Sequence, residues 1–214
     1  MQTVNLHHVA LAERDDEFRA ALLNASHVTA DGWPLVALLQ SADVDVERVT
    51  GSDWLHRTSG NGTLARHRVA LFGASPQAGA RFAELINPGL RFAEHGRKED
   101  WDAESAVKTL NERQIDLVIV AVTPPFGDVF GAALHAAGYR GSVISVGGSV
   151  DMLVGLQQRA PRLAQVTGTE WLWRLANSPR RLAHRYLVLC IPTLIATIAP
   201  EILANRRSMK ATRT

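Results

Sequence analysis

The sequence lacks the features that mark several large classes of protein. It has a single cysteine, Cys190, which excludes an internal disulfide framework and suits a reducing compartment. Its first residues, MQTVNLHHVALAERDD, contain no basic region followed by an apolar core, so we expect no secretory signal. No run reaches the roughly 20 apolar residues that span a bilayer, so we expect no transmembrane helix.

Several catalytic motifs are also missing. The absence of GxGxxG disfavours a nucleotide-binding oxidoreductase, and there is neither a GxSxG elbow nor a zinc-type His/Cys cluster. His7 and His8 fall in an expected strand, where neighbouring side chains point to opposite faces and cannot share a metal. Two DxD matches, at 43–45 and 100–102, fall in a polar turn and at a helix start. We therefore interpret both as turns or caps and expect no metal site.

Acidic residues are nearly absent from the end of the chain. Residues 171–214 contain eight lysines and arginines but only one acid, Glu201, a balance of +7. Residues 1–170 contain 15 lysines and arginines and 20 acids, a balance of −5. This asymmetry indicates that the C-terminal part meets an anionic ligand or surface.

The sequence does contain short β-branched runs that alternate with helical patterns. Expected strands are 3–9, 26–30, 68–72, 90–94, 116–122 and 142–146. Expected helices are 15–25, 34–42, 52–60, 76–87, 102–114 and 129–139, with Pro34 and Pro76 at helix starts. Runs such as DLVIVAV are apolar on both faces, as central parallel strands are. We predict a Rossmann-like α/β core over residues 1–170, with helices on both faces, and an arginine-rich helical appendage over 171–214.

Loops that follow the strands of such a sheet are the expected ligand sites. The GASP loop, 73–76, is compatible with a phosphate at a helix start, but a tight turn explains it better. The glycine pair Gly147-Gly148 allows either close approach of a ligand or a simple turn. Asp31 follows a strand directly. It is either a helix cap or a general base that projects into the cleft, and position alone favours the cap.

Long segments of the chain resemble one family. TVNLHHVALAERDDEFRAALLNASHVTADGWPLVALL, ERVTGSD and VGGSVDMLVGLQQRAPRLAQVTGTEWLWRLANSPRRLAHRY are similar to the WecG/TagA/CpsF glycosyltransferases (glycosyltransferase family 26). The resemblance implies an inverting, metal-independent enzyme without a cofactor. Such an enzyme moves a sugar from a UDP-sugar to a sugar on a membrane polyprenyl diphosphate, often N-acetylmannosamine onto lipid-linked N-acetylglucosamine, in cell-surface polysaccharide synthesis.

The resemblance also implies roles for particular residues. Asp31, in the matching ADG, becomes the candidate base, and Arg174 and Arg181 are expected to approach the nucleotide diphosphate. Seven residues apart, these two arginines would share a face of one continuous helix, unless Pro179 between them breaks it. The full set of expected substrate-binding residues is Thr3, Asn5, Asp128, Gly147, Gly148, Asp151, Arg174, Arg181 and Arg185.

Three departures from the family pattern support an alternative. Phe126-Gly127-Asp128 stands where the family has a basic residue, glutamine and glutamate, and His184 stands where it commonly has arginine. The family's strand and helix upstream of Thr-x-Asn are expected to be missing here. The alternative is a catalytically weakened relative that binds nucleotide-sugar or lipid intermediate in a biosynthetic complex.

The apolar segment near the end has one helical face, formed by Leu187, Ile191, Leu194, Ile195, Ile198 and Ile202. We expect Pro192 and Pro200 to interrupt it, and we expect it to lie in the bilayer interface at the inner face of the plasma membrane. A buried C-terminal helix in a homo-oligomer is the alternative. We expect no nucleic-acid partner.

Overall fold

The computed structural model describes residues 1–158 and 160–212, and all of their side chains except those of residues 181 and 210–212. A six-stranded parallel sheet has the strand order β2-β1-β6-β5-β3-β4. Its strands are β1 (Gln2–Val4), β2 (Val28–Ala30), β3 (Val69–Gly73), β4 (Leu90–Glu94), β5 (Leu117–Ala121) and β6 (Ser142–Ser145). The prediction of a parallel α/β sheet is confirmed.

The chain forms two compact units, each built from segments that are distant in sequence. Unit 1 contains Met1–Thr3, Glu17–Val28 and Gly51–Gln158, and unit 2 contains Val4–Asp16, Thr29–Thr50 and Arg159–Thr214. Unit 1 holds the helices α4 (Gly51–Gly60), α5 (Pro76–Leu85), α6 (Ala103–Glu112), α7 (Phe126–Ala136) and α8 (Ser149–Leu153), the short turns η1 (Leu64–Arg66) and η2 (Lys98–Asp100), and most of α2 (Asp16–Leu23).

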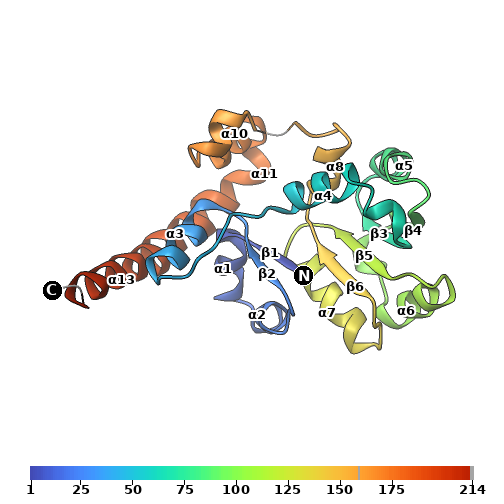
Figure 1. Cartoon of the computed structure of the whole chain (residues 1–214), viewed down its shortest axis with the longest axis horizontal. Coiled ribbons are helices and arrows are strands. Elements are labelled where there is room, and N and C mark those ends of the chain that lie inside the picture. The colour runs from blue at the N-terminus through green and yellow to red at the C-terminus, as the bar shows by residue number, and fades with distance from the viewer. Residues whose placement is uncertain (159, 213–214) are drawn as a thin grey trace. The chain divides into compact units, whose positions relative to one another are not determined.

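Strands β3 to β6 of unit 1 carry helices on both faces (Figure 1). Alternate residues of β5 separate into two cores, because successive side chains in a strand point to opposite faces. Ile119 packs with Leu55 of α4 and Phe82 of α5, whereas Val120 packs in the second core with α6 and α7. This arrangement confirms the expectation from the fully apolar run DLVIVAV.

Unit 2 packs helices against one another. Its helices are α1 (Leu6–Ala12), α3 (Trp33–Ser41), α9 (Arg162–Val166), α10 (Glu170–Asn177) and α11 (Pro179–Ala183), followed by η3 (His184–Cys190), α12 (Ile191–Thr193), η4 (Leu194–Ile198) and α13 (Ala199–Thr212). Ile198 is 1% exposed and packs with Leu35 and Val36 of α3. The end of the chain is therefore part of the core of unit 2.

The expected strand 3–9 is mostly wrong. Only Gln2–Val4 forms a strand, and α1 begins at Leu6. The side chain of Asn5 accepts a hydrogen bond from the backbone N–H of His7 at 3.0 Å, which caps the helix and ends the strand. His7 and His8 therefore lie on a helix, and the argument from strand alternation does not apply to them. Other expected elements appear within a few residues of their predicted bounds.

The C-terminal segment also differs from prediction. His184–Met209 is one continuous helical stretch of 26 residues, long and apolar enough by length and composition to cross a membrane, so the expected shortness is wrong. Pro192 and Pro200 do not interrupt it. Each follows a wide π-type turn, η3 or η4, which accommodates the missing backbone donor.

The expected apolar face of this stretch divides in two. Leu194, Ile198 and Ile202 pack in the core of unit 2, while Leu187 and Ile195 are more than half exposed. The hydroxyls of Thr193 and Thr197 instead donate to the carboxylate of Glu13, at 3.0 and 2.6 Å. The helix thus buries one side against unit 2 and presents an apolar stripe on the other.

Candidate active site

A cavity of about 210 Å³ lies within unit 2. Three parts of the sequence line it: the start of α1, the loop and helix after β2, and the C-terminal segment from Gly168 onwards. The lining residues are Asn5, Leu6, His7, Asp31, Gly32, Trp33, Pro34, Arg48, Gly168, Glu170, Trp171, Arg174, Arg185, Tyr186, Cys190, Ile191 and Leu194. Predicted site residues Asn5, Asp31, Arg174 and Arg185 are among them.

Asp31 directly follows the carboxyl end of β2, as predicted. Its backbone N–H donates to the carbonyl of Val4 at 2.7 Å, which fixes the residue at the strand end. Gly32, with φ of 131°, is the N-cap of α3, and no side chain caps that helix. The helix-cap interpretation of Asp31 is therefore wrong, and its carboxyl group lines the cavity instead.

Burial raises the pKa of Asp31 from 3.8 to about 6. Arg174 opposes this shift most strongly, Glu170 adds to it, and Arg48 and Arg185 also lower the pKa. A carboxylate with a pKa near 6 is mostly ionised at neutral pH and yet is a stronger base than an exposed aspartate. General-base catalysis favours this combination.

The two histidines of α1 are held neutral. Burial, with the nearby charge of Arg185, lowers the pKa of His7 to about 4 and that of His8 to about 3. His8 completes the cap of α1, since its Nδ1 accepts from the backbone N–H of Asn5 at 3.2 Å. His7 lines the cavity, where it presents an uncharged imidazole at neutral pH.

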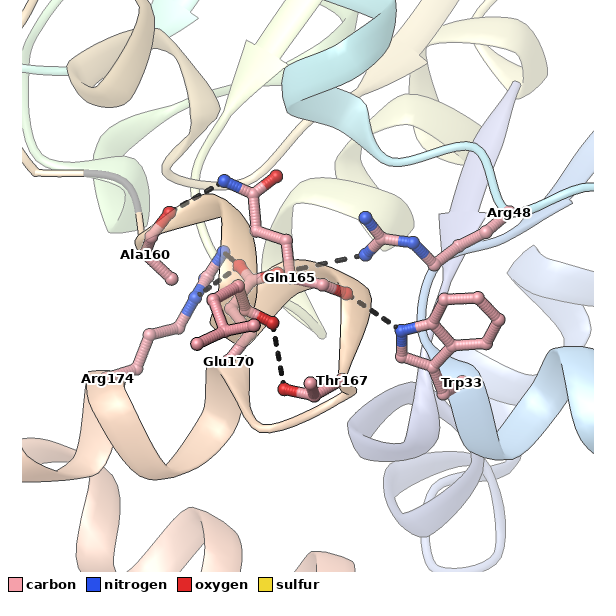
Figure 2. Close-up of polar contacts among 8 residues, drawn as sticks. Trp33, Arg48, Ala160, Gln165, Thr167, Glu170 and Arg174 are labelled. Carbon is pink, nitrogen blue, oxygen red and sulfur yellow. Dashed lines mark hydrogen bonds and ion pairs between the residues drawn. The ribbon is translucent and has the colours of Figure 1, made fainter.

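Two arginines share one carboxylate at the cavity. Arg174 donates to Oε1 of Glu170 through Nε at 2.9 Å and also through a terminal nitrogen. A terminal nitrogen of Arg48 lies 3.7 Å from Oε2 of the same carboxylate. Figure 2 shows both guanidinium groups directed at Glu170. The cluster joins the loop before α4 to helix α10.

Arg185 differs from these two arginines. Its guanidinium lies 5.6 Å from the ring of Tyr186, and its Nε is buried without a hydrogen-bond partner. No carboxylate in the described part of the chain forms a direct ion pair with it. A half-buried guanidinium with an unsatisfied N–H would stabilise an anionic ligand beside it.

Arg181 does not share a helix with Arg174. Helix α10 ends at Asn177 and α11 begins at Pro179, so the helix breaks at Pro179, the alternative to a continuous shared face. The side chain of Arg181 lies outside the described residues.

The remaining predicted residues belong to unit 1. Gly147, with φ of 55°, has open space around its Cα, and Gly148 is the N-cap of α8, which contains Asp151. Thr3 is buried and donates to the carbonyl of Ser145 at 3.4 Å. The placement of Gly147 leaves its backbone accessible, as a ligand-binding loop requires.

Asp128, predicted to bind substrate, is 2% exposed. Burial raises its pKa to about 6, while a hydrogen bond with Ser145 and the charge of the Met1 amino group oppose the shift. Its neighbour Phe126 packs 5.7 Å from Trp101 and 6.2 Å from Phe130, between ring centres. The Phe-Gly-Asp departure therefore lies among aromatic side chains.

Two motifs that the sequence suggested as ligand sites, the DxD match at 100–102 and the GASP loop, form helix caps in the structure. Asp102 caps α6, since its carboxylate accepts from the backbone N–H of Ser105 at 2.8 Å. Ser75 of the GASP loop caps α5 by accepting from Ala78 N–H at 3.1 Å. No group of three or more potential metal ligands occurs among the described residues.

Sequence reasoning missed several residues of the cavity, chiefly His7, Trp33, Arg48 and Glu170. Arg48 lies in ERVTGSD and Glu170 in TEWLW, two segments that carry the family resemblance. The resemblance therefore marked both residues but indicated no function for either. Their pairing could not be inferred, because 121 residues separate them.

The chain matches a known family over nearly its whole length. The model of a family described as "Glycosyl transferase WecG/TagA/CpsF family" matches residues 1–208, nearly the whole chain.

Proposed function

Because the chain belongs to the WecG/TagA/CpsF glycosyltransferase family, we propose that it transfers a sugar from a UDP-sugar to a sugar carried on a polyprenyl diphosphate. The donor sugar would be N-acetylmannosamine or a related hexose, and the product would serve cell-surface polysaccharide synthesis. The observation that carries this proposal is Asp31, a carboxylate of raised pKa in a cavity with three arginines.

The proposed reaction is a single displacement. The acceptor hydroxyl oxygen attacks the anomeric carbon of the donor, the bond to the UDP oxygen breaks with inversion, and Asp31 takes the hydroxyl proton. Negative charge develops on the leaving diphosphate. Guanidinium groups match diphosphate oxygens well, so Arg174, Arg181 and Arg185 would stabilise substrate phosphates without a metal ion.

The proposal also includes residues of unit 1. Thr3 and Asn5 belong to the family's Thr-x-Asn, and the loop of Gly147, Gly148 and Asp151 leaves backbone groups accessible to a donor. Asp128 would contribute through its position at the start of α7. These assignments remain part of the proposal.

We further propose that the protein acts at the cytoplasmic face of the plasma membrane as a peripheral protein. The stripe of exposed apolar residues on the long C-terminal helix supports this location: Leu187, Val188, Ile195 and Leu203. Exposed Arg206 and Arg207 follow it and would attract anionic lipid. A helix lying on the surface keeps the contacts of Thr193, Thr197 and Ile198 with unit 2, which crossing a bilayer would break.

A second candidate is a relative that binds the same molecules but transfers poorly. The burial of Asp128 and the packing of Phe126 favour it, because both residues replace polar groups of the family pattern. Weak turnover with intact binding would identify this candidate.

One experiment tests both candidates. UDP-sugars are screened against synthetic lipid-diphosphate acceptors with membranes present, and binding of UDP is measured in parallel. Transfer with inversion at the anomeric carbon supports the enzyme. Binding without transfer for every donor supports the second candidate, and neither binding nor transfer rejects both.

A further inference from the structure

The carboxylate of Glu170 lies between two guanidinium groups. It contacts Arg174 through Oε1 and Arg48 through Oε2, so both of its oxygens face guanidinium groups. The side chains of Arg48 and Glu170 are only 17% and 19% exposed, which limits screening by water. All three residues line the cavity that contains Asp31.

The same carboxylate helps to hold residues 165–170 in place. Arg48 stacks over Trp33 at 5.8 Å, and the indole N–H of Trp33 donates to the carbonyl of Gln165 at 3.0 Å (Figure 2). Gly168, with φ of 73°, lies so close that a Cβ there would meet Cδ1 of Trp33 at 2.9 Å. Trp33 and Arg48 thus hold residues 165–170 against the opposite wall of the cavity through these contacts.

Charge decides which anion these arginines prefer. A carboxylate carries one negative charge and two acceptor oxygens. A diphosphate carries at least two charges and more oxygens, and it pairs with guanidinium groups in a bidentate manner. A diphosphate that enters the cavity therefore competes with the Glu170 carboxylate for both arginines.

We propose that Glu170 is an internal competitor for the diphosphate site, which holds Arg48 and Arg174 in the ligand-free state and is displaced when a diphosphate binds. Displacement removes the tie between Arg48 and Glu170 and loosens residues 160–174 from Trp33. Occupancy of the site is thereby coupled to the mobility of residues 160–174, while Arg174 keeps a contact with the diphosphate. This inference rests on the proposed function only in expecting a diphosphate at this cavity.

The test uses the full chain with inorganic pyrophosphate as the probe. Glu170→Gln keeps the size and one acceptor oxygen but removes the charge that competes. We expect Glu170→Gln to bind pyrophosphate about tenfold more tightly than wild type by calorimetry at low salt, with a smaller gain at high salt. Glu201→Gln, an exposed acid of α13 in the same unit, is the matched control and should change affinity less than twofold.

Unchanged or weaker pyrophosphate binding by a folded Glu170→Gln would overturn the proposal, because Glu170 would then position the arginines rather than compete. A second measurement needs no variant. Saturating pyrophosphate should increase amide hydrogen exchange in 160–174 of the wild-type protein, and unchanged or slower exchange there would also overturn it. Neither measurement involves sugar transfer, so failure of the proposed function would be seen separately, in the donor screen.

Discussion

Each unit of the molecule contains an aspartate whose pKa burial raises to about 6, but the surroundings differ. In unit 1, Asp128 is 2% exposed, forms a hydrogen bond with the side chain of Ser145 and interacts electrostatically with the amino group of Met1. In unit 2, Asp31 lines a cavity together with Arg48, Arg174 and Arg185. A shifted pKa alone therefore does not identify a site in this protein. Access to a cavity and nearby cations distinguish Asp31 from Asp128.

The largest expected effect is on catalysis by Asp31. Asp31→Asn should lower transfer by about 10²–10⁴-fold, because an amide cannot accept the proton of the attacking hydroxyl. UDP binding should stay close to wild type, and the melting temperature at pH 7 should rise rather than fall, because burial makes the ionised carboxylate the less stable form in the fold. Asp45→Asn, an exposed carboxylate of the same unit, is the control. Steady-state kinetics checks this, and more than half of the wild-type rate in Asp31→Asn would remove the base role.

Stability should distinguish the two sides of the C-terminal helix. Ile198 is 1% exposed, so Ile198→Ala should lower the free energy of unfolding by about 2–4 kcal/mol through lost packing. Ile195 is 65% exposed, and Ile195→Ala should cost less than about 0.5 kcal/mol. Urea unfolding measures both. Equal costs would mean that the helix does not pack on unit 2 as described.

The stability contribution of Asp128 should depend on pH in the opposite sense to that of a salt-bridged aspartate. The folded-state pKa of Asp128, about 6, lies above its ordinary value of 3.8, so its ionised form destabilises the fold above pH 6. Asp128→Asn should therefore raise stability at pH 7 by about 1–3 kcal/mol relative to wild type. This gain should shrink as the pH falls through 6 towards 4. A gain that is independent of pH would assign it to packing instead.

Vesicle binding should distinguish the contribution of the charged residues of the C-terminal helix from that of its exposed apolar residues. Arg206→Gln and Arg207→Gln should each weaken binding to anionic vesicles by about 1 kcal/mol, and less at high salt. Leu187→Ser should weaken it to the same extent at both salt concentrations, since apolar burial is not screened. Co-sedimentation at two salt concentrations measures this. Undiminished binding by all three variants would place the membrane contact elsewhere.

The smallest expected effect is that of chelation. Activity should be unchanged by EDTA, because the proposed charge neutralisation comes from arginines. A loss of turnover that magnesium or manganese restores would show that a metal site was missed.

Local patterns were enough to predict unit 1. The apolar runs at 68–72 and 116–122 became β3 and β5, and Pro76 began α5, because periodicity and proline geometry act over a few residues. The stretch after Val4 was mispredicted for the same reason. Its β-branched pattern favoured a strand, but the cap formed by Asn5 starts a helix there.

The sequence by itself determined the parallel sheet, the charge asymmetry and the position of Asp31 at a strand end, since each follows from the order of neighbouring residues. Only the tertiary structure decided that Asp31 meets Arg48, Arg174 and Arg185 at one cavity, and that Glu170 bridges two of those arginines. It also decided which side of the C-terminal helix is buried. The contacts of Asp31 with Arg174 and Arg185, and of Arg48 with Glu170, join segments more than 100 residues apart. Such contacts depend on how whole elements pack rather than on any local pattern.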